Sequence, residues 1–239
     1  MDISSVRFIY FDIDDTLLDH AAAAAGALQE THSKFSSDIG YIPFNAFIER
    51  FQIENSAVWL AMARRELTPE DVKLQRFTRT LAHLTGERAE SFNQIGKALS
   101  KTFLEHYGQF WKLFAGAEEA LTAAENIAPT GLLSNGFPEQ QYGKLRHFGW
   151  ENRFAAVVLS ADAGAMKPER AIFEFAGNAA GIGSPNELLY IGDTYETDVE
   201  GAKNAGWQTI WLNHGNKAEN GNSADLTVSS LKELPFFLK

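Results

Sequence analysis

The chain has 239 residues, 45% of them hydrophobic, and a formal net charge of −10 at pH 7. This apolar content suffices for a sizeable core and excludes a disordered chain, while the acidic balance argues against a nucleic-acid polymer or an anionic membrane as partner. The absence of cysteine excludes disulfides, thiolate metal sites and cysteine nucleophiles.

The first predicted element is a buried strand, the apolar run VRFIYF at residues 6–11. No convincing strand follows before about residue 113, and the intervening sequence predicts helices instead. Thr68 followed by Pro69, with Asp71 at the third helical position, is typical of a helix start. The helices are predicted at residues 21–35, 44–66, 69–84 and 89–107. Four helices of this length can bury a core of their own, so we predict an all-helical insert at residues 19–113.

Strand and helix patterns alternate through the rest of the chain. Strands are predicted at residues 130–134, 155–160, 187–192 and 208–213, with a weaker one at 225–230, and helices at 117–127, 138–148, 168–181 and 198–206. This alternation predicts parallel strands joined by crossover helices. We therefore expect an α/β fold, with a Rossmann-like three-layer α/β/α core formed by residues 1–18 and 114–239.

Polar side chains follow the predicted strands of this core. In an open parallel sheet, ligands bind beyond the carboxyl ends of the strands. One edge of the sheet is therefore expected to gather carboxylates, a lysine, an amide and a hydroxyl. These side chains are Asp12, Asp14, Ser134, Asn135, Lys167, Asp193 and Asp198.

This combination of residues suits the chemistry of a phosphate ester. Carboxylate oxygens are preferred ligands of Mg²⁺, and Mn²⁺ fits the same set. A lysine and a serine hydroxyl can bind a phosphoryl group. A carboxylate beside the metal can act as nucleophile and form an acyl-phosphate, and a second carboxylate two residues away can transfer protons.

Four ordered motifs make the pattern more specific. FDIDDTLLD at residues 11–19 resembles the first motif of the haloacid dehalogenase superfamily, an Asp-x-Asp-x-Thr after an apolar strand. LLSNG, GAMKPERAIF and YIGDTYETD are similar to its second, third and fourth motifs, and each lies beside a predicted strand. The resemblance spans nearly the whole chain. It implies a hydrolase core, and it identifies the insert with the helical cap that closes over the site in part of the superfamily.

The resemblance also implies roles for the acidic residues. Asp12 would be the nucleophile and a metal ligand. Asp14 would be the general acid/base and would bind the metal through its backbone carbonyl. Asp193 would be the third protein ligand of Mg²⁺. Asp15 and Asp19 are expected to be scaffold residues.

The remaining roles concern the phosphate and its surroundings. Ser134 and Lys167 would hold the phosphate, with Lys167 taking part in catalysis. Asn135 fits a phosphate contact and a turn role equally well. Thr16 would support the loop, and Asp198 would order Lys167 or a metal-bound water.

Asp14 narrows the reaction, because the dehalogenase members of the superfamily lack an acid at this position. It favours phosphoryl chemistry and leaves a phosphomutase open. A binding protein without turnover would be expected to have lost Asp12, Asp14 or Lys167, and all three are present. The expected enzyme is a Mg²⁺-dependent phosphatase of a small phosphate ester.

The substrate prediction comes from finer resemblances to the pyrimidine 5′-nucleotidase branch. SNGF at residues 134–137 and the cap segment with Asn55 and Trp59 are similar to that branch, so a nucleobase could stack on the ring and bond the amide. Trp59 also fits a cap-core residue. A sugar-phosphate or phosphoglycolate phosphatase is the alternative. We expect a cytoplasmic protein without signal peptide or membrane span, acting as a monomer or weak homodimer.

Overall fold

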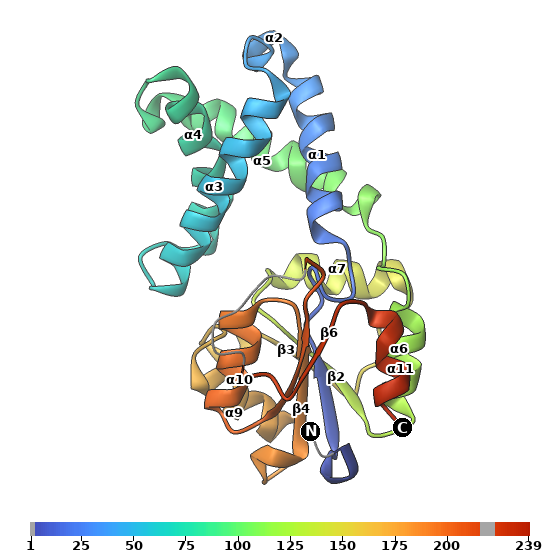
Figure 1. Ribbon diagram of the computed structural model, residues 1–239. Coiled ribbons are helices and arrows are strands. Elements are labelled where there is room, and N and C mark those ends of the chain that lie inside the picture. Colours follow the sequence, from blue (N-terminus) through green and yellow to red (C-terminus); the bar gives the residue numbers. More distant parts are fainter. Residues whose placement is uncertain (1–2, 216–222) are drawn as a thin grey trace. The chain divides into compact units, whose positions relative to one another are not determined.

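The computed structural model describes residues 3–215 and 223–239. The chain forms two compact units, which we call the core unit and the helical unit (Figure 1). The core unit comprises Met1–His20 and Lys112–Lys239, and the helical unit comprises Ala21–Trp111. In sequence, the helical unit is thus inserted after the first strand of the core unit and before the other strands of its sheet.

The core unit is built on six strands in the order β3-β2-β1-β4-β5-β6, and every neighbouring pair is parallel. The strands are β1 (Phe8–Phe11), β2 (Thr130–Ser134), β3 (Ala156–Leu159), β4 (Leu188–Gly192), β5 (Gln208–Leu212) and β6 (Leu226–Val228). All residues of β1, β2 and β4 are buried, as expected for a parallel sheet covered on both faces. The predicted α/β Rossmann-like fold is confirmed.

Helices cover the two faces of this sheet, with α9 and α10 on one face and α6 and α11 on the other (Figure 1). The helices are α6 (Ala117–Glu125), α7 (Pro138–Phe148), α8 (Ser160–Ala163), α9 (Arg170–Ala179), α10 (Gly201–Asn204) and α11 (Leu234–Phe237). Short helical turns are η1 (Ile3–Ser5), η4 (Pro185–Glu187) and η6 (Leu231–Glu233). Two layers of helices therefore enclose the sheet, which gives a three-layer α/β/α core.

The helix predicted at residues 198–206 differs from the prediction in its first turn. The chain turns helical at Tyr195, as the π-helical segment η5 (Tyr195–Glu200), and only then continues as α10. The wider turn contains Asp198, whose side chain points inward. Asp198 is buried and accepts a hydrogen bond from the Thr194 N–H at 3.0 Å. Such π-helical turns are frequent at functional sites.

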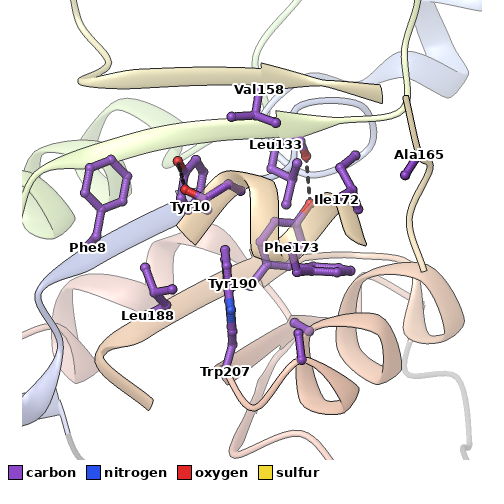
Figure 2. Packing of buried hydrophobic residues seen from close by; sticks show 13 residues of the cluster. Phe8, Tyr10, Leu133, Val158, Ala165, Ile172, Phe173, Leu188, Tyr190 and Trp207 are labelled. Atoms are coloured by element: carbon purple, nitrogen blue, oxygen red, sulfur yellow. Dashed lines mark hydrogen bonds between the residues drawn. The ribbon is translucent and has the colours of Figure 1, made fainter. Parts of the chain in front are cut away.

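Aromatic packing joins the sheet to α9 and α10. Figure 2 shows Tyr10 and Tyr190, from neighbouring strands, with Phe173 and Trp207 packed beside them. Each buried tyrosine hydroxyl donates to a backbone carbonyl, Tyr10 to Ala176 and Tyr190 to Leu133, both at 2.8 Å. Both tyrosines therefore bury a satisfied polar group in an apolar layer.

The central strand β1 fixes the place where a ligand can bind. Its neighbours are β2 on one side and β4 on the other, so the strand order reverses at β1. Loops leave the carboxyl ends of β1 and β4 in opposite directions at such a switch point, and a crevice opens there. Asp12 follows β1 and Asp193 follows β4.

The helical unit has its own apolar core. Its helices are α1 (His20–Lys34, which begins in the core unit), α2 (Ser36–Ile39), α3 (Phe44–Ala63), α4 (Pro69–Thr85) and α5 (Asn93–Tyr107), with turns η2 (Ala89–Phe92) and η3 (Gly108–Phe110). Helix α4 starts with the predicted capping box between Thr68 and Asp71. None of the helices among the described residues is long and apolar enough to span a membrane.

An arginine lies inside this helical core. The Arg76 guanidinium is stacked over the rings of Phe51, Phe77 and Phe103, at 4.7 to 5.8 Å from their centroids. Burial lowers its pKa to about 10. Cation–π contacts with three rings offset part of the cost of burying this charge.

Candidate active site

The carboxyl edge of the sheet brings together side chains from four segments of the core unit. Asp12 follows β1, Ser134 ends β2, Lys167 lies in the loop between α8 and α9, and Asp193 follows β4. Asp12, Ser134 and Lys167 are each less than one-tenth exposed. The predicted convergence of these residues is therefore present in the fold.

Lys167 is a buried cation that contacts two buried carboxylates. Its ammonium donates to Asp12 Oδ1 at 2.8 Å, to Asp198 Oδ1 at 2.7 Å and to the Tyr190 hydroxyl at 2.7 Å. Burial would lower the pKa of Lys167, but Asp12 and Asp198 outweigh it and raise that pKa well above its usual value. An ammonium has three N–H donors, and here each has an acceptor. Lys167 therefore holds the carboxylate of Asp12, the nucleophile candidate, in place, and Asp198 holds the ammonium.

One lysine does not balance the negative charge at this edge. Burial raises the pKa of Asp12 to about 7, since the attraction of Lys167 is opposed by Asp198 and Asp14. Burial, followed by Asp198 and Asp12, raises the pKa of Asp193 to about 8. Crowded carboxylates of this kind favour either protonation or a bound cation.

The donor set fits a divalent cation. Each of Asp12, Asp193 and Asp198 offers a carboxylate oxygen, and these oxygens lie within 4.8 Å of one another. Hard oxygen donors with surplus negative charge suit Mg²⁺ or Mn²⁺. Asp198 accepts from Lys167, as Asp12 does, and its second oxygen accepts from the Thr194 backbone N–H. Its contacts are those of the predicted residue that orders Lys167.

Asp193 is held by its neighbours. The Thr16 hydroxyl donates to Asp193 Oδ1 at 3.2 Å, and the Trp211 indole N–H donates to the Asp193 backbone carbonyl at 2.9 Å. Thr16 is fully buried, so it connects the loop after β1 to the carboxylate after β4. Thr16 was predicted to support the loop, and its hydrogen bond to Asp193 is a contact through which it can do so.

Asn135 and Ser134 differ in what they can offer a substrate. The Asn135 amide bonds the backbone of Lys167 twice, donating to its carbonyl at 3.0 Å and accepting from its N–H at 2.8 Å. Ser134 Oγ accepts from the Gly136 N–H and from Gln141 Nε2, both at 3.1 Å. Because both bonds are donated to the oxygen, the Ser134 hydroxyl hydrogen can be given to an anion. Asn135 acts on the lysine backbone instead.

Asp14 contacts helix α7 and the start of α1. Lys144 Nζ donates to its Oδ1 at 2.5 Å, Gln141 Nε2 donates to its Oδ2 at 2.7 Å, and His20 Nδ1 lies 3.7 Å from Oδ1. Burial would raise the pKa of Asp14, but Lys144 and His20 outweigh it and lower that pKa to about 2. Asp14 is therefore ionised here, in the form that accepts a proton.

Sequence reasoning missed Gln141, Lys144 and Tyr190. Gln141, Lys144 and Leu145 are the buried residues of α7, with the spacing of the inward face of a helix. Polar residues at inward positions were the available signal. Tyr190 lies inside an apolar strand run, where nothing distinguished its hydroxyl from that of a packing tyrosine.

Tyr190→Phe is expected to lower the free energy of unfolding by about 1–3 kcal/mol. The change removes an acceptor of the buried Lys167 ammonium and the donor to the Leu133 carbonyl. Urea unfolding measures the effect. The matched control is Tyr142→Phe at an exposed tyrosine, for which a change within about 0.5 kcal/mol is expected. Equal stability of the two variants would contradict the contact.

Asn55 and Trp59, the candidate substrate residues, lie four residues apart on α3 of the helical unit. This spacing puts them on one face of the helix. Asn55 Oδ1 is buried and has no hydrogen-bond partner among the described residues, and Trp59 is half-buried. A buried amide oxygen without a partner is the kind of group that a ligand can satisfy.

Comparison with known proteins places these features in a family. Residues 6–206 match the haloacid dehalogenase-like hydrolase family. The chain is 30% identical to pyrimidine 5′-nucleotidase YjjG of Escherichia coli (strain K12), over 95% of each chain. It is 27% identical to human N-acylneuraminate-9-phosphatase, over 100% of this chain and 96% of that one.

A solved structure gives the same result for the fold. The HAD-hydrolase YfnB of Bacillus subtilis, crystallised with magnesium, superimposes with a TM-score of 0.84 at 26% identity, over 98% of both chains. The similarity extends through both units of the chain.

Proposed function

We propose that this chain, which belongs to the haloacid dehalogenase-like hydrolase family, hydrolyses phosphate monoesters through an aspartyl-phosphate on Asp12. The observation that carries the proposal is the Asp12–Lys167 pair. A buried carboxylate at the end of the central strand is held by an ammonium at 2.8 Å, as a positioned nucleophile requires. Asp14, two residues on, supplies the acid/base carboxylate.

The reaction proceeds in two steps. A carboxylate oxygen of Asp12 attacks phosphorus and the bond from phosphorus to the ester oxygen breaks. Asp14 gives the departing oxygen the proton that it received from water in the preceding turnover. Water then attacks the phosphorus of the aspartyl-phosphate and gives its proton to Asp14. The bond from phosphorus to Asp12 breaks and phosphate leaves. The Ser134 hydroxyl donates to a phosphoryl oxygen in both steps.

A divalent cation fits this scheme as cofactor. Asp12, Asp193 and the Asp14 backbone carbonyl would hold it. A bound Mg²⁺ supplies positive charge beside the phosphoryl oxygens. We further propose that the helical unit is the cap domain of the enzyme and that it selects the leaving group.

Chelation is expected to stop phosphate release and to lower thermal stability. EDTA-treated protein should regain activity with millimolar Mg²⁺, and its Tm should rise by a few degrees because the cation binds only the folded state. Asp193→Asn should remove most of this Tm shift. An apoprotein that hydrolyses phosphate esters at the full rate, with no Tm response to Mg²⁺, would contradict the metal site.

The proposed substrates are pyrimidine nucleoside 5′-monophosphates. Two observations support this choice. The Escherichia coli relative is named a pyrimidine 5′-nucleotidase, and α3 carries Asn55, with its unpartnered amide oxygen, on the same face as Trp59. An amide and an aromatic ring together suit a nucleobase.

The second candidate function is hydrolysis of a sugar phosphate, which the similarity to human N-acylneuraminate-9-phosphatase favours. A panel of dUMP, dTMP, purine monophosphates, sugar phosphates and phosphoglycolate separates the two by kcat/KM. We expect the pyrimidine nucleotides to exceed the other substrates by about tenfold or more. A higher kcat/KM for a sugar phosphate would overturn the nucleotide assignment and leave the phosphatase intact.

A further inference from the structure

Two buried side chains of α7 converge on the acid/base carboxylate. Lys144 is 1% exposed and Gln141 is 3% exposed. Lys144 donates to one oxygen of Asp14, and Gln141 donates to the other. Lys144 also donates to Gln141 Oε1 at 3.1 Å, so the two side chains brace each other. Asp14 is therefore held at both carboxylate oxygens.

Gln141 links this carboxylate to the phosphate-binding edge. Its Nε2 donates both to Asp14 Oδ2, at 2.7 Å, and to Ser134 Oγ, at 3.1 Å. A single amide nitrogen thus bridges the Asp14 carboxylate and the Ser134 hydroxyl, which we propose contacts the phosphate. Water that attacks the aspartyl-phosphate has to come within hydrogen-bond reach of Asp14 to give up its proton.

Gly136 provides the room for this link. A Cβ atom on Gly136 would lie 1.7 Å from Gln141 Nε2, so any larger residue forces the amide away from its position. The backbone φ of Gly136 is not in the left-handed region, so alanine is compatible with the local conformation. The glycine of the SNG motif is required by Gln141, and its replacement tests Gln141 without altering either α7 side chain.

We infer that Gln141 and Lys144 are positioning residues that aim Asp14 at the water that hydrolyses the aspartyl-phosphate. This inference rests on the proposed function. In this step the water oxygen bonds to phosphorus, the bond from phosphorus to Asp12 breaks, and the water proton moves to Asp14. Both side chains suit this step because they donate hydrogen bonds to the Asp14 carboxylate and accept none from it. The carboxylate oxygens therefore act as acceptors, as transfer of the water proton requires.

A defect confined to the second step has a kinetic signature. When hydrolysis of the covalent intermediate is slow, kcat and KM fall together and kcat/KM stays constant. The first turnover then releases its leaving group in a burst, and the intermediate accumulates. General damage to the fold lowers kcat/KM and gives no burst.

The experiment compares Lys144→Met and Gln141→Leu with the wild type on p-nitrophenyl phosphate, whose leaving group needs no proton. We expect kcat to fall about 100-fold with kcat/KM within about threefold of wild type. The burst should approach one p-nitrophenolate per chain, and acid quenching should trap phosphorylated protein. Gly136→Ala should show the same signature in a weaker form, so the test survives if burial makes Lys144→Met unstable.

Gln140→Leu and Arg146→Met are matched controls on the same helix. Among the described residues, the side-chain partners of Asp14 are Lys144, Gln141 and His20, and Arg146 is exposed, so both control variants should keep wild-type kinetics. Loss of kcat/KM in parallel with kcat, without a burst, would overturn the inference. Wild-type protein that releases no phosphate from any ester would instead overturn the proposed function.

Discussion

Replacing Asp12 with asparagine is expected to lower kcat for phosphate ester hydrolysis by about 10⁴-fold or more. The amide removes the anionic oxygen that attacks phosphorus, and no other described carboxylate occupies its place against Lys167 at the end of β1. The fold should persist. Burial already raises the pKa of Asp12 to about 7, so a neutral side chain of the same shape suits the site.

The control for this variant is Asp15→Asn, which makes the same chemical change three residues away. Asp15 has a φ of 57°, and asparagine adopts this left-handed conformation readily. Its activity should stay within about tenfold of wild type. Acid quenching of wild-type turnover should trap phosphorylated protein, and the Asp12→Asn variant should trap none. Wild-type rates in the Asp12→Asn variant would rule out the mechanism.

Replacing Lys167 with methionine is expected to lower the free energy of unfolding by about 3–5 kcal/mol and to reduce activity more than 100-fold. Lys167 is 4% exposed and bonds two buried carboxylates, on Asp12 and Asp198. Its removal leaves both carboxylates inside without a counter-charge. Urea unfolding at neutral pH with EDTA present measures the stability term without compensation by a metal.

A double-mutant cycle with Asp198→Asn isolates the pair. If Lys167 and Asp198 compensate each other, the Lys167→Met/Asp198→Asn double variant should be more stable than the sum of the single losses predicts, by about 1–3 kcal/mol. If the two losses of unfolding free energy simply add, the 2.7 Å contact between Lys167 and Asp198 contributes no interaction energy to stability. The cycle tests the charge pairing independently of any turnover.

The sequence predicted the parts of this molecule that follow from periodicity and strand ends. Apolar runs located five of the six strands, because a parallel sheet buried on both faces leaves uninterrupted hydrophobic segments, and a weaker pattern located β6. Asp12, Lys167 and Asp198 were singled out because they follow such runs. In the fold, Lys167 donates hydrogen bonds to both carboxylates, which places the three residues in one site.

The supporting residues could not be predicted in the same way. Lys144 and Gln141 reach Asp14 across a sequence separation of about 130 residues, and no local pattern encodes such a pairing. Tyr190 was hidden because its ring packs as a core residue while its hydroxyl serves Lys167. Asn135 was expected near a phosphate, but its contacts to the Lys167 backbone depend on a loop conformation that composition does not reveal.

The position of β1 at the centre of the sheet also has a consequence for the order of folding during synthesis. This strand leaves the ribosome well before its partners in the ladder, Thr130 and Leu188, which lie more than 100 residues further along the chain. The helical unit between them has short-range contacts and can form early, whereas the sheet depends on distant pairings and forms slowly. Until then FIYF is a strongly hydrophobic strand with both edges unpaired, which makes it prone to aggregation.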